Sequence, residues 1–184
     1  SLVATQSDVL LAGLDALTLL DCISARASFG RLLKAHPVRI NDKGRICLLQ
    51  ARHPLLVLSK EQVVANDILL DESIRVLVIS GPNTGGKTVT LKIVGLFALM
   101  VRAGLHLPCD MESEMAFFSD IYADIGDTQD LARDLSSFSA HMTQMVQLLE
   151  ETDRRRSDNV HTVLQQPLLL LDEPVTSTDP TEGA

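Results

Sequence analysis

The residues best suited to chemistry form a glycine-rich loop near the middle of the chain. Residues 81–88 read GPNTGGKT and fit the pattern G-x-x-x-x-G-K-[ST]. The glycines let the backbone turn tightly, so its N–H groups can point at phosphate oxygens. Lys87 is suited to reach the β- and γ-phosphates of ATP in binding and catalysis, and the Thr88 hydroxyl is suited to bind Mg²⁺. The residues predicted to hold the nucleotide are Gly81, Pro82, Asn83, Thr84, Gly85, Gly86, Lys87, Thr88 and Val89.

A pair of acids follows an apolar run much further along the chain. Asp172 and Glu173 come directly after PLLLL, at residues 167–171. Acidic residues at the carboxyl end of a strand lie where ligands bind in open α/β sheets. Asp172 is therefore predicted to hold Mg²⁺ through its water shell, and Glu173 to act as the general base for an attacking water. A pair of solvated carboxylates at a strand end is the alternative.

A serine-rich turn is the third feature. Residues 135–141 read LSSFSAH and lead into an amphipathic pattern over 139–151. Ser137 or Ser139 can cap that helix and do nothing more. Phosphate contact is compatible with capping, because both use a helix N-terminus. The residues alone leave both interpretations open.

Alternating strand and helix patterns predict the elements that must position these residues. Residues 74–80 read IRVLVIS, a continuous apolar run typical of a buried central strand, and a helix is predicted from 86 or 87 to about 102. Further strands are predicted around 116–125 and over 167–171. Residues 7 to about 35 are predicted to be helical with Ser7 as a cap. Residues 38–71 are predicted to form short strands at RICLLQ, PLLVL and QVVAN. The pattern predicts an α/β fold with a mostly parallel sheet behind an N-terminal helical segment.

Composition narrows the class of protein. The 184 residues are 46% hydrophobic, which is enough for a core. A net charge of −8 argues against the whole chain being a nucleic-acid-binding module. The 3 cysteines form no CxxC pair, and the 5 histidines have no metal spacing, so the histidines are predicted to be surface or capping residues. The start of the chain does not read as a signal peptide, and no apolar run predicts a membrane span.

Three segments together resemble the ATPase domain of the MutS family, an ABC-type P-loop NTPase. They are SGPNTGGKTVTLKIVGL, IYADIGDTQDLARDLSSFSAHM and STDPTEGA. The likeness is strongest to the second subfamily, MutS-two, which is associated with recombination control. It implies that residues 1–36 end a helical core and that residues 37–184 form an ATPase domain that continues past the end of this chain.

The resemblance also implies roles for single residues. Gln129 would lie in the segment that senses Mg²⁺ and positions water, and Ser137 would reach the γ-phosphate bound by the neighbouring subunit of a homodimer. Asp172 and Glu173 would be the Walker B pair. Asp179 would belong to the loop that signals across the dimer. Two positions that would flank the adenine are Val63 and Val64.

The expected function is ATP hydrolysis in a cytoplasmic or organellar protein that binds double-stranded or branched DNA through regions outside this chain. A ribosome-linked role is a variant within the same subfamily, and full-length members also carry an endonuclease domain. Residues 172–180, DEPVTSTDP, depart from the family pattern and resemble transporter ATPases. The alternatives are therefore the nucleotide-binding subunit of an ABC transporter and an inactive, incomplete ATPase remnant.

Overall fold

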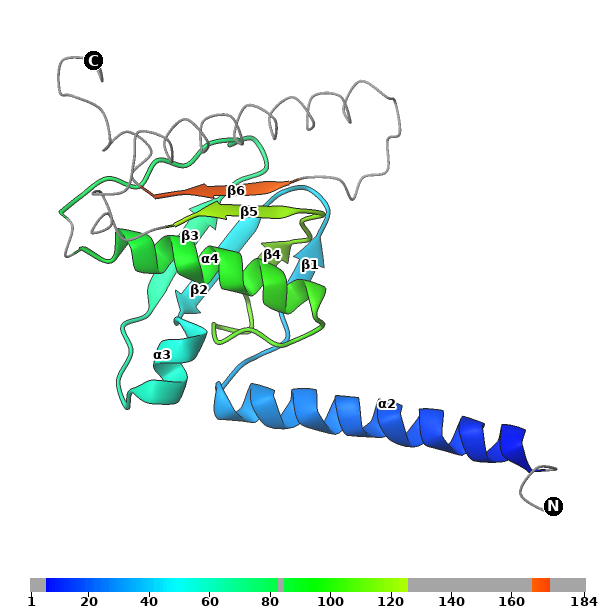
Figure 1. The fold of residues 1–184 in the computed structure, drawn as a ribbon. Coiled ribbons are helices and arrows are strands. Elements are labelled where there is room, and N and C mark those ends of the chain that lie inside the picture. The colour runs from blue at the N-terminus through cyan, green and yellow to red at the C-terminus, as the bar shows by residue number, and fades with distance from the viewer. Residues whose placement is uncertain (1–5, 83–84, 126–166, 173–184) are drawn as a thin grey trace, which may run out of the picture.

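The computed structural model describes residues 6–82, 85–125 and 167–172 and has a mixed α/β architecture. Helix α2 (Ser7–Leu32) extends away from a body in which helix α4 (Lys87–Arg102) lies against two small sheets (Figure 1). The prediction of an N-terminal helix is thereby confirmed. The prediction that Ser7 caps it is wrong, because Gln6 occupies the N-cap position and makes no side-chain capping bond.

Helix α2 exposes apolar side chains along most of its length. A surface helix of a globular protein usually has one apolar face and one polar face. In α2 the leucines recur on more than one side, so no single packing surface would cover them all. The proposed division of the chain at residue 36 stays a prediction. The large apolar residues of α2 that are at least half exposed are Val9, Leu10, Leu11, Leu14, Leu17, Leu19, Leu20, Ile23 and Leu32.

The larger sheet has four strands in the order β1-β4-β2-β3. They are β1 (Arg39–Asn41), β4 (Glu114–Ala116), β2 (Ile46–Ala51) and β3 (Asn66–Leu70). Strands β1 and β4 are parallel, whereas β2 is antiparallel to both β3 and β4. The sheet therefore joins strands from both sides of α4 in the sequence.

The smaller sheet pairs two segments that are far apart in the sequence. Strand β5 (Ile121–Asp124) runs parallel to β6 (Leu168–Leu171), with Ile121 opposite Leu168. The expectation of one mostly parallel sheet is not confirmed by the described strands, which form two parallel pairs and two antiparallel pairs. The reason is β2, whose two neighbours both run against it.

The apolar run before the glycine-rich loop is not a strand in this structure, so that prediction is wrong for the described chain. Within the part of the chain that the structure describes, residues 74–80 pair with no strand, and the side chains of Val76 and Val78 are 76% and 81% exposed. Apolar and β-branched residues favour a strand only where a neighbouring strand offers hydrogen bonds. Here β5 and β6 pair directly with each other.

Two further short elements differ from their predictions. The segment PLLVL forms part of helix α3 (Pro54–Ser59), because Pro54 at its first turn has the φ that starts a helix. The strand predicted over QVVAN begins only at Asn66, at the end of that segment, and runs to Leu70. This later segment forms the strand because it pairs with β2. The pairing contains a bulge at Gln50, whose backbone N–H donates a 2.8 Å hydrogen bond to Asp67.

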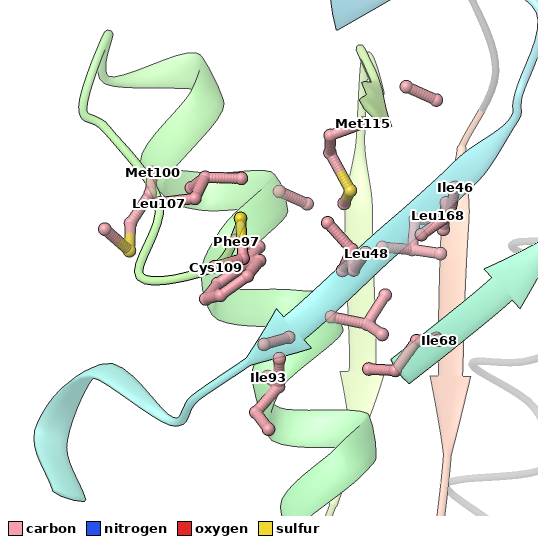
Figure 2. Close-up of a cluster of buried hydrophobic side chains, with 14 of the residues drawn as sticks. Ile46, Leu48, Ile68, Ile93, Phe97, Met100, Leu107, Cys109, Met115 and Leu168 are labelled. Atoms are coloured by element: carbon pink, nitrogen blue, oxygen red, sulfur yellow. The ribbon is translucent and has the colours of Figure 1, made fainter. Parts of the chain in front are cut away.

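Helix α4 supplies much of the core. Its predicted bounds are confirmed, and the chain turns after it at Gly104, which has a left-handed φ of 68°. Ile93, Phe97 and Met100 of α4 belong to the same buried cluster as Leu48 and Met115 of the larger sheet (Figure 2). Burying an apolar side chain of this size stabilises the fold by about 1.5–3 kcal/mol. This packing fixes α4, and with it the end of the glycine-rich loop.

Candidate nucleotide-binding site

Two oxygens from distant parts of the chain meet at the start of α4. The Thr88 hydroxyl donates a 2.7 Å hydrogen bond to the Oδ2 atom of Asp172, across 84 positions of sequence. Thr88 lies in the first turn of α4, and Asp172 follows β6 directly. The Asp172 backbone N–H also donates to the Asp124 carbonyl at 2.9 Å, which continues the β5–β6 ladder and fixes the position of the acid. The structure therefore brings together the two residues predicted to bind Mg²⁺.

The described ends of the glycine-rich loop have the backbone that the motif requires. Gly86 is the N-cap of α4 with a left-handed φ of 78°, and Gly81 has a φ of 148°. Residues with a side chain rarely adopt such angles. The Lys87 ammonium donates a 2.6 Å hydrogen bond to the Gly81 carbonyl, which links the two ends of the loop. The Gly85 N–H donates to the Pro82 carbonyl at 2.9 Å.

These oxygens fit a magnesium ion that is completed by other ligands. Mg²⁺ prefers oxygen ligands in octahedral geometry and usually keeps several waters beside one or two protein groups and substrate phosphates. Thr88 and Asp172 offer one hydroxyl and one carboxylate, both partly buried. Among the described residues, no group of three or more His, Cys, Asp and Glu side chains could hold a metal on its own. The pair is thus suited to an ion that arrives with a nucleotide.

Several predicted site residues lie outside the described residues, so their predictions stand untested. They are Asn83, Thr84, Gln129, Ser137, Glu173 and Asp179. Val63 and Val64 are described and lie in the connection between α3 and β3. Val63 is half-buried, and Val64 is 82% exposed. Their predicted contact with adenine also stays a prediction.

Sequence reasoning missed two residues beside this site. Asp124 ends β5 opposite Leu171, so a second carboxylate lies at the same edge of the small sheet as Asp172. The signal in the sequence was the acid at the end of IYAD. Gly95, two turns along α4, is buried against β6. A glycine inside a strongly apolar helix is itself a sign of close packing.

His53 departs from the prediction that the histidines are surface or capping residues. Its side chain is 8% exposed, and its Nδ1 atom has no hydrogen-bond partner among the described residues. His53 occupies the N-cap position of α3 but makes no side-chain capping bond. Burial lowers the pKa of His53 below its ordinary value of 6.5, and the positive charge of Lys92 on α4 lowers it further. Burial therefore favours the neutral form of the His53 side chain.

The family of the chain follows from comparison with known proteins. The sequence profile described as MutS domain V matches residues 77–178, which include Gly81, Lys87, Thr88 and Asp172. The chain belongs to the MutS family. Within it, the chain resembles proteins named endonuclease MutS2, which confirms the resemblance to the second subfamily.

Three of these relatives illustrate the extent of the match. Endonuclease MutS2 of Shouchella clausii (strain KSM-K16) is 45% identical over 182 residues, which is 99% of this chain and 22% of that protein. The protein of the same name from Geobacillus sp. (strain WCH70) is 46% identical over 184 residues, 100% of this chain and 22% of that protein. The putative endonuclease MutS2 of Bacillus subtilis (strain 168) is 45% identical over 181 residues, 98% of this chain and 21% of that protein. This MutS-family chain thus spans about a fifth of the length of its curated relatives.

Proposed function

We propose that this chain is the ATP-binding and ATP-hydrolysing core of a homodimeric MutS2-type protein that acts on DNA. The hydrogen bond between Thr88 and Asp172 carries the proposal. It joins the end of a phosphate-loop motif to an acid at the carboxyl end of a strand, and an unrelated glycine-rich turn would have no reason to make that contact. Membership of the MutS family supports a function in DNA metabolism over a function as a transporter subunit.

In the proposed site the protein's own groups divide the work of binding and catalysis. The loop backbone and the N-terminus of α4 hold the phosphates, since both offer unpaired N–H groups and a positive dipole. Lys87 leaves the Gly81 carbonyl and neutralises the β- and γ-phosphate charge. Thr88 and Asp172 would hold Mg²⁺, and the ion would neutralise charge that develops on the phosphates.

Two residues known only from the sequence complete the proposed reaction. Glu173 follows Asp172 directly and would accept a proton from the attacking water. Gln129 would orient that water. Val63 and Val64 would lie beside the adenine, and Ser137 of the partner subunit would reach the γ-phosphate.

The proposed fold is that of a P-loop NTPase. The parallel pairing of β5 with β6, covered by α4, is the arrangement that supports it. In this fold residues 74–80 would add a further parallel strand beside them when the nucleotide is bound. A ligand that binds at the carboxyl edge of such a sheet meets the loop and the acids together.

DNA contact is proposed to come from other parts of a longer protein. A net charge of −8 makes these 184 residues a poor match for a phosphate backbone. The relatives are named endonucleases. This protein is proposed to act on DNA in the cytoplasm. No helix in the described part of the chain is long and apolar enough to span a membrane.

Nucleotide titration with a matched pair of lysine variants tests the proposal. We expect Lys87→Ala to weaken the affinity for a fluorescent ATP analogue by about 100-fold, because a charge-assisted contact to the phosphates is lost. Lys92→Ala removes an exposed lysine from the same helix and should leave the affinity within about twofold. Equal affinity in the wild-type chain and Lys87→Ala would remove the basis for the proposed site.

A further inference from the structure

We propose that Gly95 and Leu170 are positioning residues that set the approach of α4 to β6 and so hold Thr88 beside Asp172. The inference rests on the proposed function for its catalytic consequence. Its structural content, a mechanical link between two contacts on one helix, is independent of any nucleotide.

The absence of a side chain at Gly95 is what allows the close approach. Gly95 is buried, and a Cβ atom added there would lie 2.7 Å from the Cδ1 atom of Leu170, where ordinary van der Waals contact is 3.4–4 Å. Leu170 is 4% exposed and belongs to the hydrophobic core. The atom in close approach is the end of a side chain, but that side chain is enclosed by the core. We therefore expect part of the strain from an added methyl group to move α4 away from β6.

The helix and strand repeats connect this contact to the site. Thr88 and Gly95 are seven positions apart on α4, two turns of helix, and so lie on nearly the same face. Leu170 and Asp172 are two positions apart at the end of β6, where alternate residues share a face of the strand. One side of α4 and one side of β6 therefore meet at both contacts.

The consequence for chemistry follows from the tolerance of catalytic geometry. Misplacement of a reacting group by about 1 Å can cost on the order of 100-fold in rate. Moving α4 outward at Gly95 would separate the Thr88 hydroxyl from the Asp172 carboxylate, and these are the two oxygens proposed to share Mg²⁺. The phosphate contacts proposed for Gly86 and Lys87 would persist, because these residues begin α4 and would move with it.

The first test separates positioning from general damage to the fold. In the whole chain, nucleotide affinity is measured with and without Mg²⁺. We expect Gly95→Ala to reduce the Mg²⁺-dependent gain in affinity by about tenfold or more and to leave the Mg²⁺-free affinity within about twofold. Adding Leu170→Val, which removes the Cδ atoms, should restore most of the gain. Gly13→Ala is the matched control, because a Cβ at this helical glycine of α2 meets nothing within 4 Å.

The second test needs no nucleotide and measures coupling between the two contacts. Thr88→Val removes the hydroxyl and should lower the thermal unfolding midpoint of the wild-type chain. In the Gly95→Ala background the same change should have little further effect, because the hydrogen bond to Asp172 is already separated. In the Gly13→Ala background it should keep its full effect.

The outcomes distinguish the two proposals. The wild-type chain could show no Mg²⁺-dependent nucleotide binding while positions 88 and 95 are still coupled. That result would contradict the proposed function but support the mechanical link. Normal wild-type binding with additive effects of Thr88→Val and Gly95→Ala would overturn the link alone. Equal losses of Mg²⁺-dependent and Mg²⁺-free binding in Gly95→Ala, or no recovery with Leu170→Val, would also overturn it.

Discussion

Single residues in this chain show how far a side chain's type determines its role. Thr88 and Asp172 were predicted to share an ion, and the fold places their oxygens 2.7 Å apart. His53 was predicted to be a surface or capping residue; it is buried at the N-cap position of α3 without making a side-chain capping bond. The motif around Thr88 has a chemical reason for each residue, whereas a lone histidine fits a cap, a surface or a core position equally well.

The buried His53 makes the free energy of unfolding depend on pH. Its folded pKa is lowered, so between that pKa and 6.5 the unfolded chain binds a proton that the folded chain does not. The free energy of unfolding therefore keeps its full value above pH 6.5 and falls as the pH drops from that value toward the folded pKa. The decrease is at most about 1.4 kcal/mol per pH unit. Urea unfolding between pH 7.5 and 5.5 measures it.

A matched pair of histidine variants isolates this effect. His53→Asn removes the titrating group and should flatten the fall in stability below pH 6.5. His36→Asn replaces an exposed histidine and is the control for the histidine-to-asparagine substitution itself. If both variants keep the wild-type slope, other groups cause the acid sensitivity.

At the scale of elements, the sequence predicted those with strong periodicity or clear boundaries. Helices α2 and α4 and strands β2 and β6 lie where their patterns indicated. Short apolar runs were harder, because five residues fit a strand or a helix equally well. PLLVL is helical because Pro54 begins helix α3. The strand predicted at QVVAN forms in the next segment instead, because that segment pairs with β2. Sequence alone also could not show that Gly95 lies against Leu170, which depends on tertiary packing.

Amide hydrogen exchange can test whether residues 74–80 join the sheet when nucleotide binds. Without a ladder partner, the amides of Val76 and Val78 should exchange their hydrogens with solvent quickly, whereas the β6 amides bonded to β5 should be protected. Binding of ATP and Mg²⁺ should slow exchange in this run if it then joins the sheet. Amide hydrogen exchange followed by mass spectrometry measures both states. Unchanged exchange on nucleotide binding would contradict the proposed additional strand.

At the scale of the whole molecule, helix α2 and the proposed nucleotide site are the two features that concern contacts with other chains. Helix α2 exposes large apolar side chains along most of its length, and extended exposed apolar surfaces often mark sites of contact with other chains. The proposed nucleotide site would also be incomplete in one subunit, because Ser137 would act on the phosphate bound by a neighbour. A dimer is therefore part of the proposed chemistry, and its site can be tested by mixing inactive chains.

Mixing Lys87→Ala with Ser137→Ala should restore ATP hydrolysis that neither variant has alone. In a mixed dimer, one site combines an intact loop from the Ser137→Ala chain with an intact serine from the Lys87→Ala chain. Random exchange makes half of the dimers mixed, and each has one working site of two, so activity should reach about a quarter of the wild-type rate. A phosphate-release assay measures the rate, and light scattering confirms that dimers form.

The control mixture distinguishes action across the dimer from simple stabilisation by a second subunit. Lys87 and Glu173 are proposed to serve the same site from the same chain, so a dimer of Lys87→Ala with Glu173→Gln has one site without its lysine and the other without its base. This mixture should stay inactive at every ratio. Equal recovery in both mixtures would show that pairing alone restores activity, and no recovery in either, with dimers present, would mean that Ser137 acts within its own subunit or not at all.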